Sequence, residues 1–515
     1  MLDDTSNGAG FGMLQIQHHD NVECIEIEVL EESSMPHTGC PTPPPGPSRT
    51  STPPPPGASR TSTPPPPGAS RTSTPPLPRT PPNQTIAKRK RRWQEANISY
   101  NEEVMDTLRT VGSATIELIN HLKAPDELES RSPASQLSLN VSIDGLPLHK
   151  STTLQYWPIL FNINELPRVP VMAAGIFYGL SKPENIEQYL RPLVDEINFL
   201  IEHGIIINGK KLFVKLRAII ADTPARSFVK GTVGHTGYAG CMKCVVEGQY
   251  SREGRTVVFP GVGAPKRTDK GFRENAYPKH CKMISPLLDL KDFDIINDVI
   301  VADRLHLIDL GVMKRLLIGW RDGSLGKVRW STSQCSQISK ALGNIKLPAE
   351  IHRPLRPVVY AGKWKGSEFA SFLHYASIVV LKEHFPQECY QHFLLLFCAV
   401  TILSSRVYRP MWSLAGQMLE RFVTQYSHVY GERYTGCPSN VHNLQHVYEE
   451  VARLGPLPTL STYPFENELQ HLKRQLRSGY KNLEQTINRL SELDKFHIML
   501  KFLHQKASNV FVIYF

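Results

Sequence analysis

The stretch GYAGCMKCVV, at residues 237–246, places Cys241 and Cys244 in a CxxC pattern, and the chain has no second CxxC. Zn²⁺ in a structural site takes four ligands, of which this pair supplies two. If the pair holds a metal ion, a distant part of the chain must return to these cysteines, which restricts the folds that are open to it. The alternative is a pair of free thiols.

The nine cysteines do not form a disulfide framework in our interpretation. Their number is odd, and the first residues, MLDDTSNGAG, contain no apolar signal-peptide core, so we expect a reducing compartment. The longest apolar run, FLLLFCAVTIL at 393–403, has 11 residues, whereas a membrane span needs about 20. It is therefore interpreted as a buried helix, and no membrane partner is expected.

Charge is distributed unevenly along the chain. The whole chain carries +10, and residues 1–40 contain eight acids and no Lys or Arg, so residues 41–515 carry +18. A basic body is typical of proteins that bind a polyanion such as nucleic acid, although a mildly basic soluble protein fits equally well.

The N-terminal region has a composition that opposes folding. The unit TSTPPPPGASR occurs at 50–60 and again at 61–71, within a Pro-rich stretch that follows the acidic leader. Residues 1–86 are therefore predicted to be disordered. The next stretch, 87–94, holds five adjacent cations, Lys88 to Arg92, which indicate nuclear import or contact with DNA phosphates; the alternative is a solvated charge run. Residues 95–137 are predicted to be helical.

Hydrophobic periodicity predicts an α/β core followed by a helical region. Apolar alternation predicts strands, and helical spacing predicts helices, in the order strand, strand, strand, helix, strand, helix. This order favours an antiparallel meander with a parallel strand added through a helical crossover. From about 282 to 440 the chain is mostly helical, and an amphipathic helix is expected at 463–479. The six core segments are 138–148, 154–166, 169–179, 185–204, 211–222 and 223–231.

Two acids stand at the ends of predicted strands. Asp144 ends NVSID and Asp222 ends LRAIIAD, and the ends of strands are where α/β sheets place their chemistry. Taken singly, Asp144 can form a turn with Gly145, and Asp222 can cap a helix. On neighbouring strands only ~4.8 Å apart, two carboxylates repel each other unless a cation lies between them. A pair of Mg²⁺ ions in such a site can act on a phosphodiester.

The order of elements, the acids on the first and fourth strands and the CxxC nineteen residues after Asp222 resemble a known family. The sequence is similar to the RNase H-like core of CACTA-type and related eukaryotic DDE transposases. That group includes the catalytic core of the vertebrate V(D)J recombinase. The resemblance covers about residues 138 to 480, and it implies a mixed RNase H-like sheet that is interrupted by a large helical insertion.

The resemblance also implies a set of site residues. In that group the insertion ends in an HxxxH or similar pair, and the catalytic glutamate follows shortly afterwards. Here NVHNLQHVYEE contains His442 and His446, and Glu466 comes twenty residues after the second histidine. The implied structural Zn²⁺ site consists of Cys241, Cys244, His442 and His446, and the implied Mg²⁺ or Mn²⁺ site consists of Asp144, Asp222 and Glu466.

This assignment divides the chain into a first part of the core (138–240), a zinc-clamped insertion (241–446) and a closing helix with a C-terminal segment (447–515). Rival metal ligands are His235, His280 and Cys281, whose spacing is less regular. The histidine pair can also be a solvated helix face, and Glu466 can be an acid that the dipole of its helix favours.

Asp303 and His306, in ADRLHL, form a second candidate pair, with a helix start and a buried histidine as the alternative reading. The function that this set implies is metal-dependent cleavage and strand transfer on DNA. The expected partners are DNA and further copies of the chain at DNA ends, and the expected location is the nucleus. One alternative is a domesticated, non-catalytic nuclear DNA-binding or scaffold protein that keeps the fold. Another is a metal-dependent RNase.

Overall fold

The computed structural model describes residues 136–150, 152–207, 210–430 and 437–493. The chain divides into two units, Met1–Thr80 and Pro81–Phe515, and all described residues belong to the second. The predicted disordered leader and repeats at 1–86, the basic cluster at 87–94 and all but the last two residues of 95–137 lie outside the described residues.

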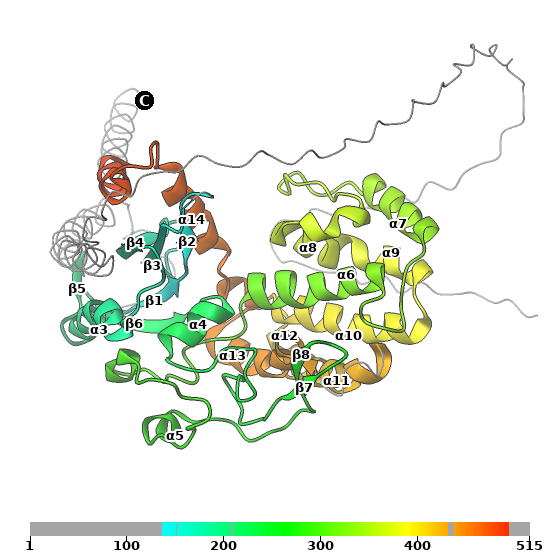
Figure 1. The fold of residues 1–515 in the computed structure, drawn as a ribbon, viewed down its shortest axis with the longest axis horizontal. Coiled ribbons are helices and arrows are strands. Elements are labelled where there is room, and N and C mark those ends of the chain that lie inside the picture. The colour runs from blue at the N-terminus through cyan, green and yellow to red at the C-terminus, as the bar shows by residue number, and fades with distance from the viewer. Residues whose placement is uncertain (1–135, 151, 208–209, 431–436, 494–515) are drawn as a thin grey trace, which may run out of the picture. The chain divides into compact units, whose positions relative to one another are not determined.

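The first part of the described chain forms a mixed sheet with helices (Figure 1). Its order of three long strands, a helix, a strand and a helix is the order predicted. The strands are β1 (Gln136–Ile143), β2 (Leu146–Pro147), β3 (Gln155–Ile163), β4 (Met172–Gly179), β5 (Ile205–Ile207) and β6 (Lys210–Ile219). The helices are α3 (Ile186–His203) and α4 (Thr223–Val229).

β1 lies at the centre of this sheet. It pairs antiparallel with β3 and parallel with β6, and β3 pairs antiparallel with β4. The predicted meander and the predicted parallel crossover are both confirmed. All residues of β1 after the first are buried, which explains why the strand contains so few charged groups. Since β1 and β6 are parallel, their carboxyl ends reach the same edge of the sheet, and the chain leaves that edge at Asp144 and near Asp222.

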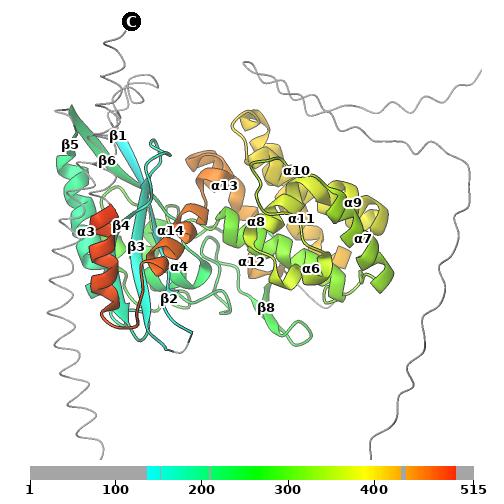
Figure 2. The same ribbon diagram turned by 90° about the horizontal axis from the view of Figure 1, so that it is seen from above.

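Helices cover both faces of the sheet (Figure 2). Successive residues of a strand point to opposite faces, so Trp157 of β3 packs in one core and Tyr156 in another. The first core is covered by α3, which Asn185 caps and Gly204 ends at φ 69°. The second is covered by α14 (Tyr463–Arg474) and by the helical residues 482–493.

The last part of the segment between the CxxC and the long helices packs with the six-stranded sheet, whereas β7 (Gln249–Ser251) and β8 (Thr256–Phe259) form a separate sheet with β9 (Cys437–Pro438). Val299 pairs with Ile219 in parallel beside β6, and Ile295 and Val299 lie in the same core as α3. The long helices begin near Arg304, later than the predicted start at about 282. Helix α5 (Asp269–Arg273) and a 3₁₀ turn (Pro286–Asp289) also precede them. Strand β9 returns to pair with β8.

The helical region forms its own core around the fully buried Trp320. The apolar run at 393–403 lies in α10, whose buried face packs against α11, as the reading of a buried helix predicts. Among the described residues, no helix is long and apolar enough to cross a membrane. The helices are α6 (Lys314–Asp322), α7 (Thr332–Asn344), α8 (Gly366–Ser371), α9 (Ser377–His384), α10 (Gln387–Leu403), α11 (Trp412–Tyr430), α12 (Ser439–His442) and α13 (Val447–Leu454), with π-helical turns at Arg304–Met313 and Phe372–Ala376 and 3₁₀ turns at Val358–Lys363, Arg409–Met411, Asn443–His446 and Leu457–Thr459.

Candidate metal centre and carboxylate site

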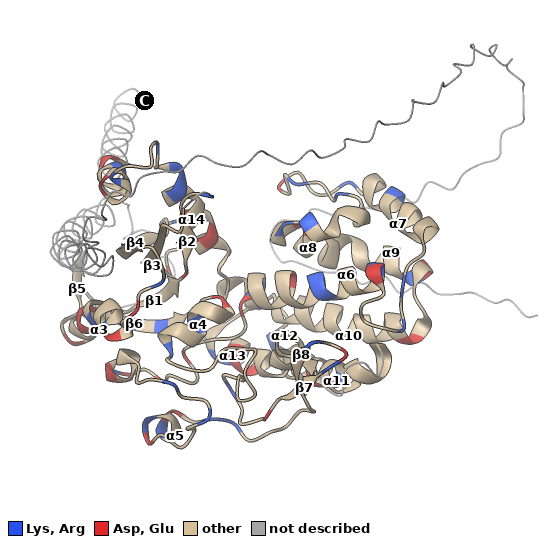
Figure 3. Cartoon of the chain, in the orientation of Figure 1, with Lys and Arg blue, Asp and Glu red and all other residues tan. Residues whose placement is uncertain are grey.

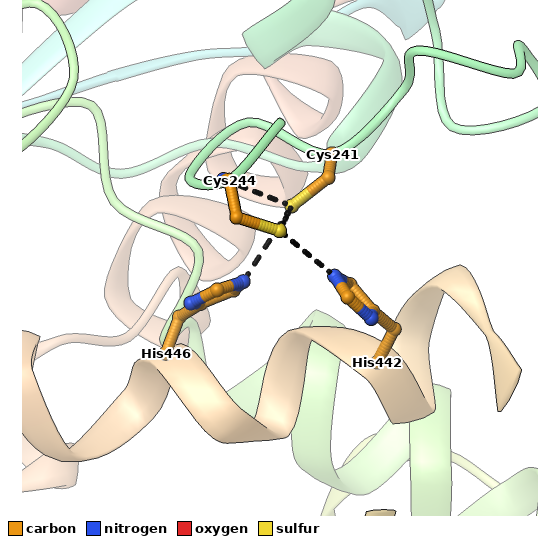
Figure 4. Close-up of side chains that lie close together, drawn as sticks. All are labelled: Cys241, Cys244, His442 and His446. Carbon is orange, nitrogen blue, oxygen red and sulfur yellow. Dashed lines mark hydrogen bonds between the residues drawn. The ribbon is translucent and has the colours of Figure 1, made fainter. Parts of the chain in front are cut away.

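The two cysteines of the CxxC meet the two histidines of the HxxxH (Figure 4). Cys241 and Cys244 lie in the loop after α4, whereas His442 ends α12 and His446 ends the 3₁₀ turn that follows it. One ligand atom from each residue lies within 4.8 Å of the other three. Because the histidines are four residues apart on continuous helical turns, both rings face the cysteine loop.

The distances within this cluster suit one tetrahedral metal ion. Cys241 Sγ lies 3.5 Å from His446 Nε2, Cys244 Sγ lies 3.4 Å from His442 Nε2, and the two sulfurs are 3.4 Å apart. Tetrahedral Zn²⁺, with Zn–S about 2.3 Å and Zn–N about 2.0–2.1 Å, requires S···N near ~3.6 Å and S···S near ~3.8 Å. A slight separation of the sulfurs would complete that geometry, so the donor set fits a metal ion such as zinc.

The surroundings of the cluster favour one thiolate, at Cys241, whereas the hydrogen bond with Cys241 raises the pKa of Cys244. All four residues are buried. The backbone N–H groups of Lys243 and Cys244 point to Cys241 Sγ, at 3.5 and 3.4 Å. Burial raises the pKa of the Cys241 thiol, but hydrogen bonds from Cys244, His442 and His446 outweigh it and hold that pKa well below its usual value. A metal ligand must be the thiolate, so this environment prepares Cys241 for that role.

A buried ion pair beside the cluster ties it to the sheet. Lys243, between the two cysteines, lies 2.5 Å from Glu450, and both side chains are under a tenth exposed. Glu450 also accepts hydrogen bonds from the backbone N–H groups of Val301 and Ala302. The sequence analysis did not identify Glu450. The available signal was its position four residues after His446, which places it on the same helix face as the histidine pair.

The three predicted carboxylates occupy the positions that their neighbours in the sequence suggest. Asp144 follows β1 and accepts the Gly145 N–H, and Asp222 caps α4 by accepting the Ala225 N–H at 2.8 Å. Glu466 lies in the first turn of α14. The local turn, cap and dipole roles are therefore present, and the charges of Asp222 and Glu466 also act on Asp144. Among the described residues, however, these three acids do not form a group whose ligand atoms all lie within 4.8 Å of one another, as the Cys/His cluster does. Each is half-buried, so the site is open to solvent.

Asp144 and Glu466 influence each other strongly. Burial, followed by the charges of Asp222 and Glu466, raises the pKa of Asp144 to about 7. Burial also raises the pKa of Glu466, while the nearby His306 and a hydrogen bond with Asp144 act in the opposite direction. The Asp144 carboxyl, protonated near neutrality, can donate that hydrogen bond to Glu466. A cation bound among these groups would remove the need for the shared proton.

Asp303 and His306 adjoin the carboxylates. His306 Nε2 lies 3.6 Å from Glu466 Oε1, and His306 Nδ1 lies 2.7 Å from Asp303 Oδ2. Burial lowers the pKa of His306, but the hydrogen bond with Asp303 and the charges of Asp303, Glu466 and Asp222 outweigh it and raise that pKa. A protonated His306 offsets part of the repulsion among the carboxylates. Asp303 also begins the π-helix Arg304–Met313, so it is both a helix start and a neighbour of the site.

Two buried acids of the π-helical turn fix the start of α14. Asp303 accepts hydrogen bonds from the Thr462 N–H and hydroxyl, at 3.0 and 2.8 Å. Asp309 accepts the Tyr463 hydroxyl at 3.0 Å while it pairs through two oxygens with Arg304. These contacts hold Glu466, three residues further along, against the sheet edge. The sequence analysis did not identify Asp309, because an acid within an apolar helix gives no sign of its partner.

The rival metal ligands lie outside the cluster among the described residues. His280 donates its Nδ1–H to the Ala239 carbonyl oxygen, 2.7 Å away. Burial lowers the pKa of His235 and raises that of Cys281, so neither environment favours a charged or thiolate form. No protein-family model matches this chain, and no curated protein matches it.

We predict that the purified full chain carries about one zinc ion per molecule, because the cluster offers a complete set of four ligands. Cys241→Ser combined with His442→Ala should abolish binding and lower the midpoint of thermal unfolding. Cys398→Ser is the matched control, since this half-buried thiol lies outside the cluster. Elemental analysis and thermal unfolding are the measurements. Wild type without metal, or a double variant that retains it, would exclude this site.

We also predict that the stability of the protein depends on pH through Asp144. The folded protein keeps the Asp144 proton between pH 3.8 and about 7, where the unfolded chain has released it. The contribution of this group to stability therefore falls as pH rises through that window. Asp144→Asn retains the acceptor for Gly145 but removes the charge. Without divalent cations, we expect the variant to unfold about 2–4 °C above wild type near pH 8, and this difference should shrink as pH falls through the window and vanish below pH 3.8.

The exposed Asp195→Asn variant is the control for this experiment, because Asp195 lies on the solvent face of α3. Its unfolding temperature should follow that of wild type throughout this pH range. An Asp144→Asn variant that is no more stable than wild type near pH 8 would mean that the three carboxylates do not repel one another.

Proposed function

We propose that this protein is a DDE transposase-like nuclease that cleaves DNA and joins strands with Mg²⁺ or Mn²⁺ held by Asp144, Asp222 and Glu466. The observation that carries the proposal is the electrostatic coupling of three half-buried carboxylates from the end of β1, the start of α4 and the first turn of α14. The charges of Asp222 and Glu466 add to burial in raising the pKa of Asp144, and a perturbed acid in a solvent-accessible site is costly for the fold, which favours a functional role.

The arrangement of the sheet supports an RNase H-like core. The central strand β1 lies between antiparallel β3 and parallel β6, and Val299 continues the parallel side next to β6. Catalysis by such a core takes place where the first and fourth long strands end, and these ends carry Asp144 and Asp222. The helical region then inserts between the Val299 segment and α14, which supplies the third acid.

The residues of the site have separable roles. Asp144, Asp222 and Glu466 would hold the cations, and His306 keeps Glu466 aimed at the other two acids. Divalent ions, when bound, supply Lewis-acid activation of a water or a 3′-hydroxyl at a phosphodiester and stabilise the leaving oxygen. In cleavage, a bond forms between the water oxygen and phosphorus, and the bond from phosphorus to the 3′-oxygen breaks. Strand transfer repeats the displacement with the freed 3′-hydroxyl as the nucleophile.

The Cys/His cluster has a structural role in this proposal. A Zn²⁺ ion with four protein ligands has no open position for substrate, as is typical of structural sites. It would hold the segment after α4 against the segment before α14 and so keep Asp222 and Glu466 within reach of each other. Removing this ion should therefore reduce folding and activity together, whereas replacing a carboxylate should remove activity without loss of folding.

The proposed place of action is the nucleus, where the cations Lys88 to Arg92 would serve import or contact DNA. These residues lie outside the described part of the chain. Two DNA ends would be joined by a homo-oligomer. A domesticated DNA-binding or scaffold protein with the same fold is the main alternative, since the basic charge of the chain serves both functions.

Incubation of supercoiled plasmid with the full chain and Mn²⁺ tests the proposal. Asp144→Asn, Asp222→Asn and Glu466→Gln should each reduce nicking by about 10³-fold or more, because the acids act as one unit. The control Glu468→Gln alters an acid two residues further along α14 that is not part of the carboxylate cluster, and it should nick like wild type.

Equal nicking by wild type and by the three carboxylate variants would indicate a contaminating nuclease and remove the support for this site. DNA binding without nicking by any form would favour the non-catalytic alternative. Cleavage of RNA in preference to DNA would favour the metal-dependent RNase.

A further inference from the structure

The positive charge of the chain is concentrated in one part of the helical region. Residues 314–365 contain eleven Lys and Arg residues and only two acids, so they carry +9 in a chain whose total charge is +10. These positions lie on α6, α7 and the segment that leads to α8 (Figure 3). Neither the zinc cluster nor the carboxylate site requires this charge for its own construction, so it points to a separate partner.

Part of this charge gathers around one buried acid. Arg356 pairs with Glu368 through two oxygens, at 2.6 and 2.7 Å, and donates to the Lys363 carbonyl oxygen. Glu368 is fully buried and also accepts the Lys365 N–H. Burial raises the pKa of Glu368, but the hydrogen bond from Arg356 and the charges of Arg356 and Arg353 outweigh it. Arg356 therefore satisfies this acid, and Arg321 pairs with Asp322 in the same stretch.

Three exposed cations and an aromatic ring make up what we call the basic platform: Arg353, Lys363, Lys365 and Tyr360. None of the three cations forms an ion pair with another described residue. Tyr360 is 54% exposed and lies between them in the sequence, in the 3₁₀ turn that ends at Lys363. Uncompensated cations with an exposed aromatic ring suit a sugar-phosphate backbone, because phosphates attract the cations and the ring can pack against a sugar.

The basic platform adjoins the carboxylate site. Lys365 precedes Gly366, where an added methyl group would lie 2.8 Å from Tyr463 Oη and 2.3 Å from Leu305. Tyr463 is three residues before Glu466 on α14, and Leu305 directly precedes His306. The platform is therefore joined to the segments that carry Glu466 and His306 through Gly366. The platform can hold phosphates that the acids alone would repel.

We infer that the basic platform binds the backbone of a DNA duplex and guides one phosphodiester toward Asp144, Asp222 and Glu466. This inference rests on the proposed function for the choice of DNA as the partner. It adds a surface and a role for Arg353, Lys363 and Lys365, which contact phosphates on either side of the scissile bond and take no part in the chemistry.

The test compares two full-length variants that each lose three exposed cations. The platform variant is Arg353→Gln/Lys363→Gln/Lys365→Gln. The control is Lys210→Gln/Lys211→Gln/Lys215→Gln, whose exposed cations lie on β6, away from the end that leads to Asp222. Binding of a fluorescent DNA duplex of about 30 base pairs is measured by anisotropy over a series of salt concentrations, with Ca²⁺ in place of Mn²⁺.

Each phosphate contact contributes about −0.9 to the slope of log K against log salt, so the slope for the platform variant should fall in magnitude by about 2–3. Its affinity at low salt should drop by about tenfold or more, and the control should keep the slope of wild type. The thermal unfolding of both variants should match wild type, because all six side chains are exposed.

Equal slopes for the platform variant and wild type, or equal losses in the two variants, would overturn the inference and place the DNA elsewhere. Tighter binding of single-stranded RNA, with the same loss in the platform variant, would overturn DNA as the partner. If the platform variant loses DNA binding but wild type never nicks plasmid, the surface is correct and the proposed chemistry is not. If wild type nicks plasmid and the platform variant keeps its DNA binding, the proposed chemistry is correct and the platform is not the DNA-binding surface.

Discussion

The described structure depends on the contact between the CxxC loop and the HxxxH turns. Cys244 and His442 are 198 positions apart, and both are buried against each other. Closing a flexible loop of that length costs about 5 kcal/mol before the constant term is added. A four-ligand zinc site in small zinc-binding peptides releases about 10–16 kcal/mol, which exceeds that cost. A metal ion bound by this cluster would therefore offset the entropy cost of closing the loop.

A continuous series of contacts connects the Cys/His cluster to the carboxylates. The chain leaves His446 along α13, where Glu450 binds Lys243 and the backbone of Val301 and Ala302. It then reaches Thr462 and Tyr463, which bind Asp303 and Asp309. The segment before α14 thus runs along the segment after Val299, and Glu466 arrives beside the strand ends. The catalytic geometry that we propose is a consequence of this path.

Sequence reasoning predicted the parts of the fold that periodicity encodes. Alternating apolar residues placed the three antiparallel strands and β6, and helical spacing placed α3 and α10. It did not predict that Val299 joins the sheet, because a short parallel segment buried on both sides has no alternation. The start of the mostly helical stretch was accordingly placed at about 282 instead of near Arg304.

For the site, the sequence predicted the metal-binding residues but not the contacts that support them. The four residues of the metal cluster and the three carboxylates came from spacing and from resemblance to a family; the structure brings the four metal-cluster residues together, and the three carboxylates remain a prediction supported by the influence of Asp222 and Glu466 on Asp144. The supporting contacts could not be predicted. Two buried ion pairs illustrate this: Glu450 pairs with Lys243, which is far away in the sequence, and Asp309 pairs with Arg304 within one π-helical turn. The burial of these charged residues is visible only in the folded chain. Their residue types alone suggest surface positions.

The central claim is that the chain holds two kinds of metal ion in two separate sites. Anomalous diffraction from crystals of the full chain soaked with Mn²⁺, collected at the zinc and manganese edges, tests it most directly. We expect a zinc peak among Cys241, Cys244, His442 and His446 and manganese peaks among Asp144, Asp222 and Glu466. Manganese absent from the carboxylates, or zinc absent from the Cys/His cluster, would contradict this account.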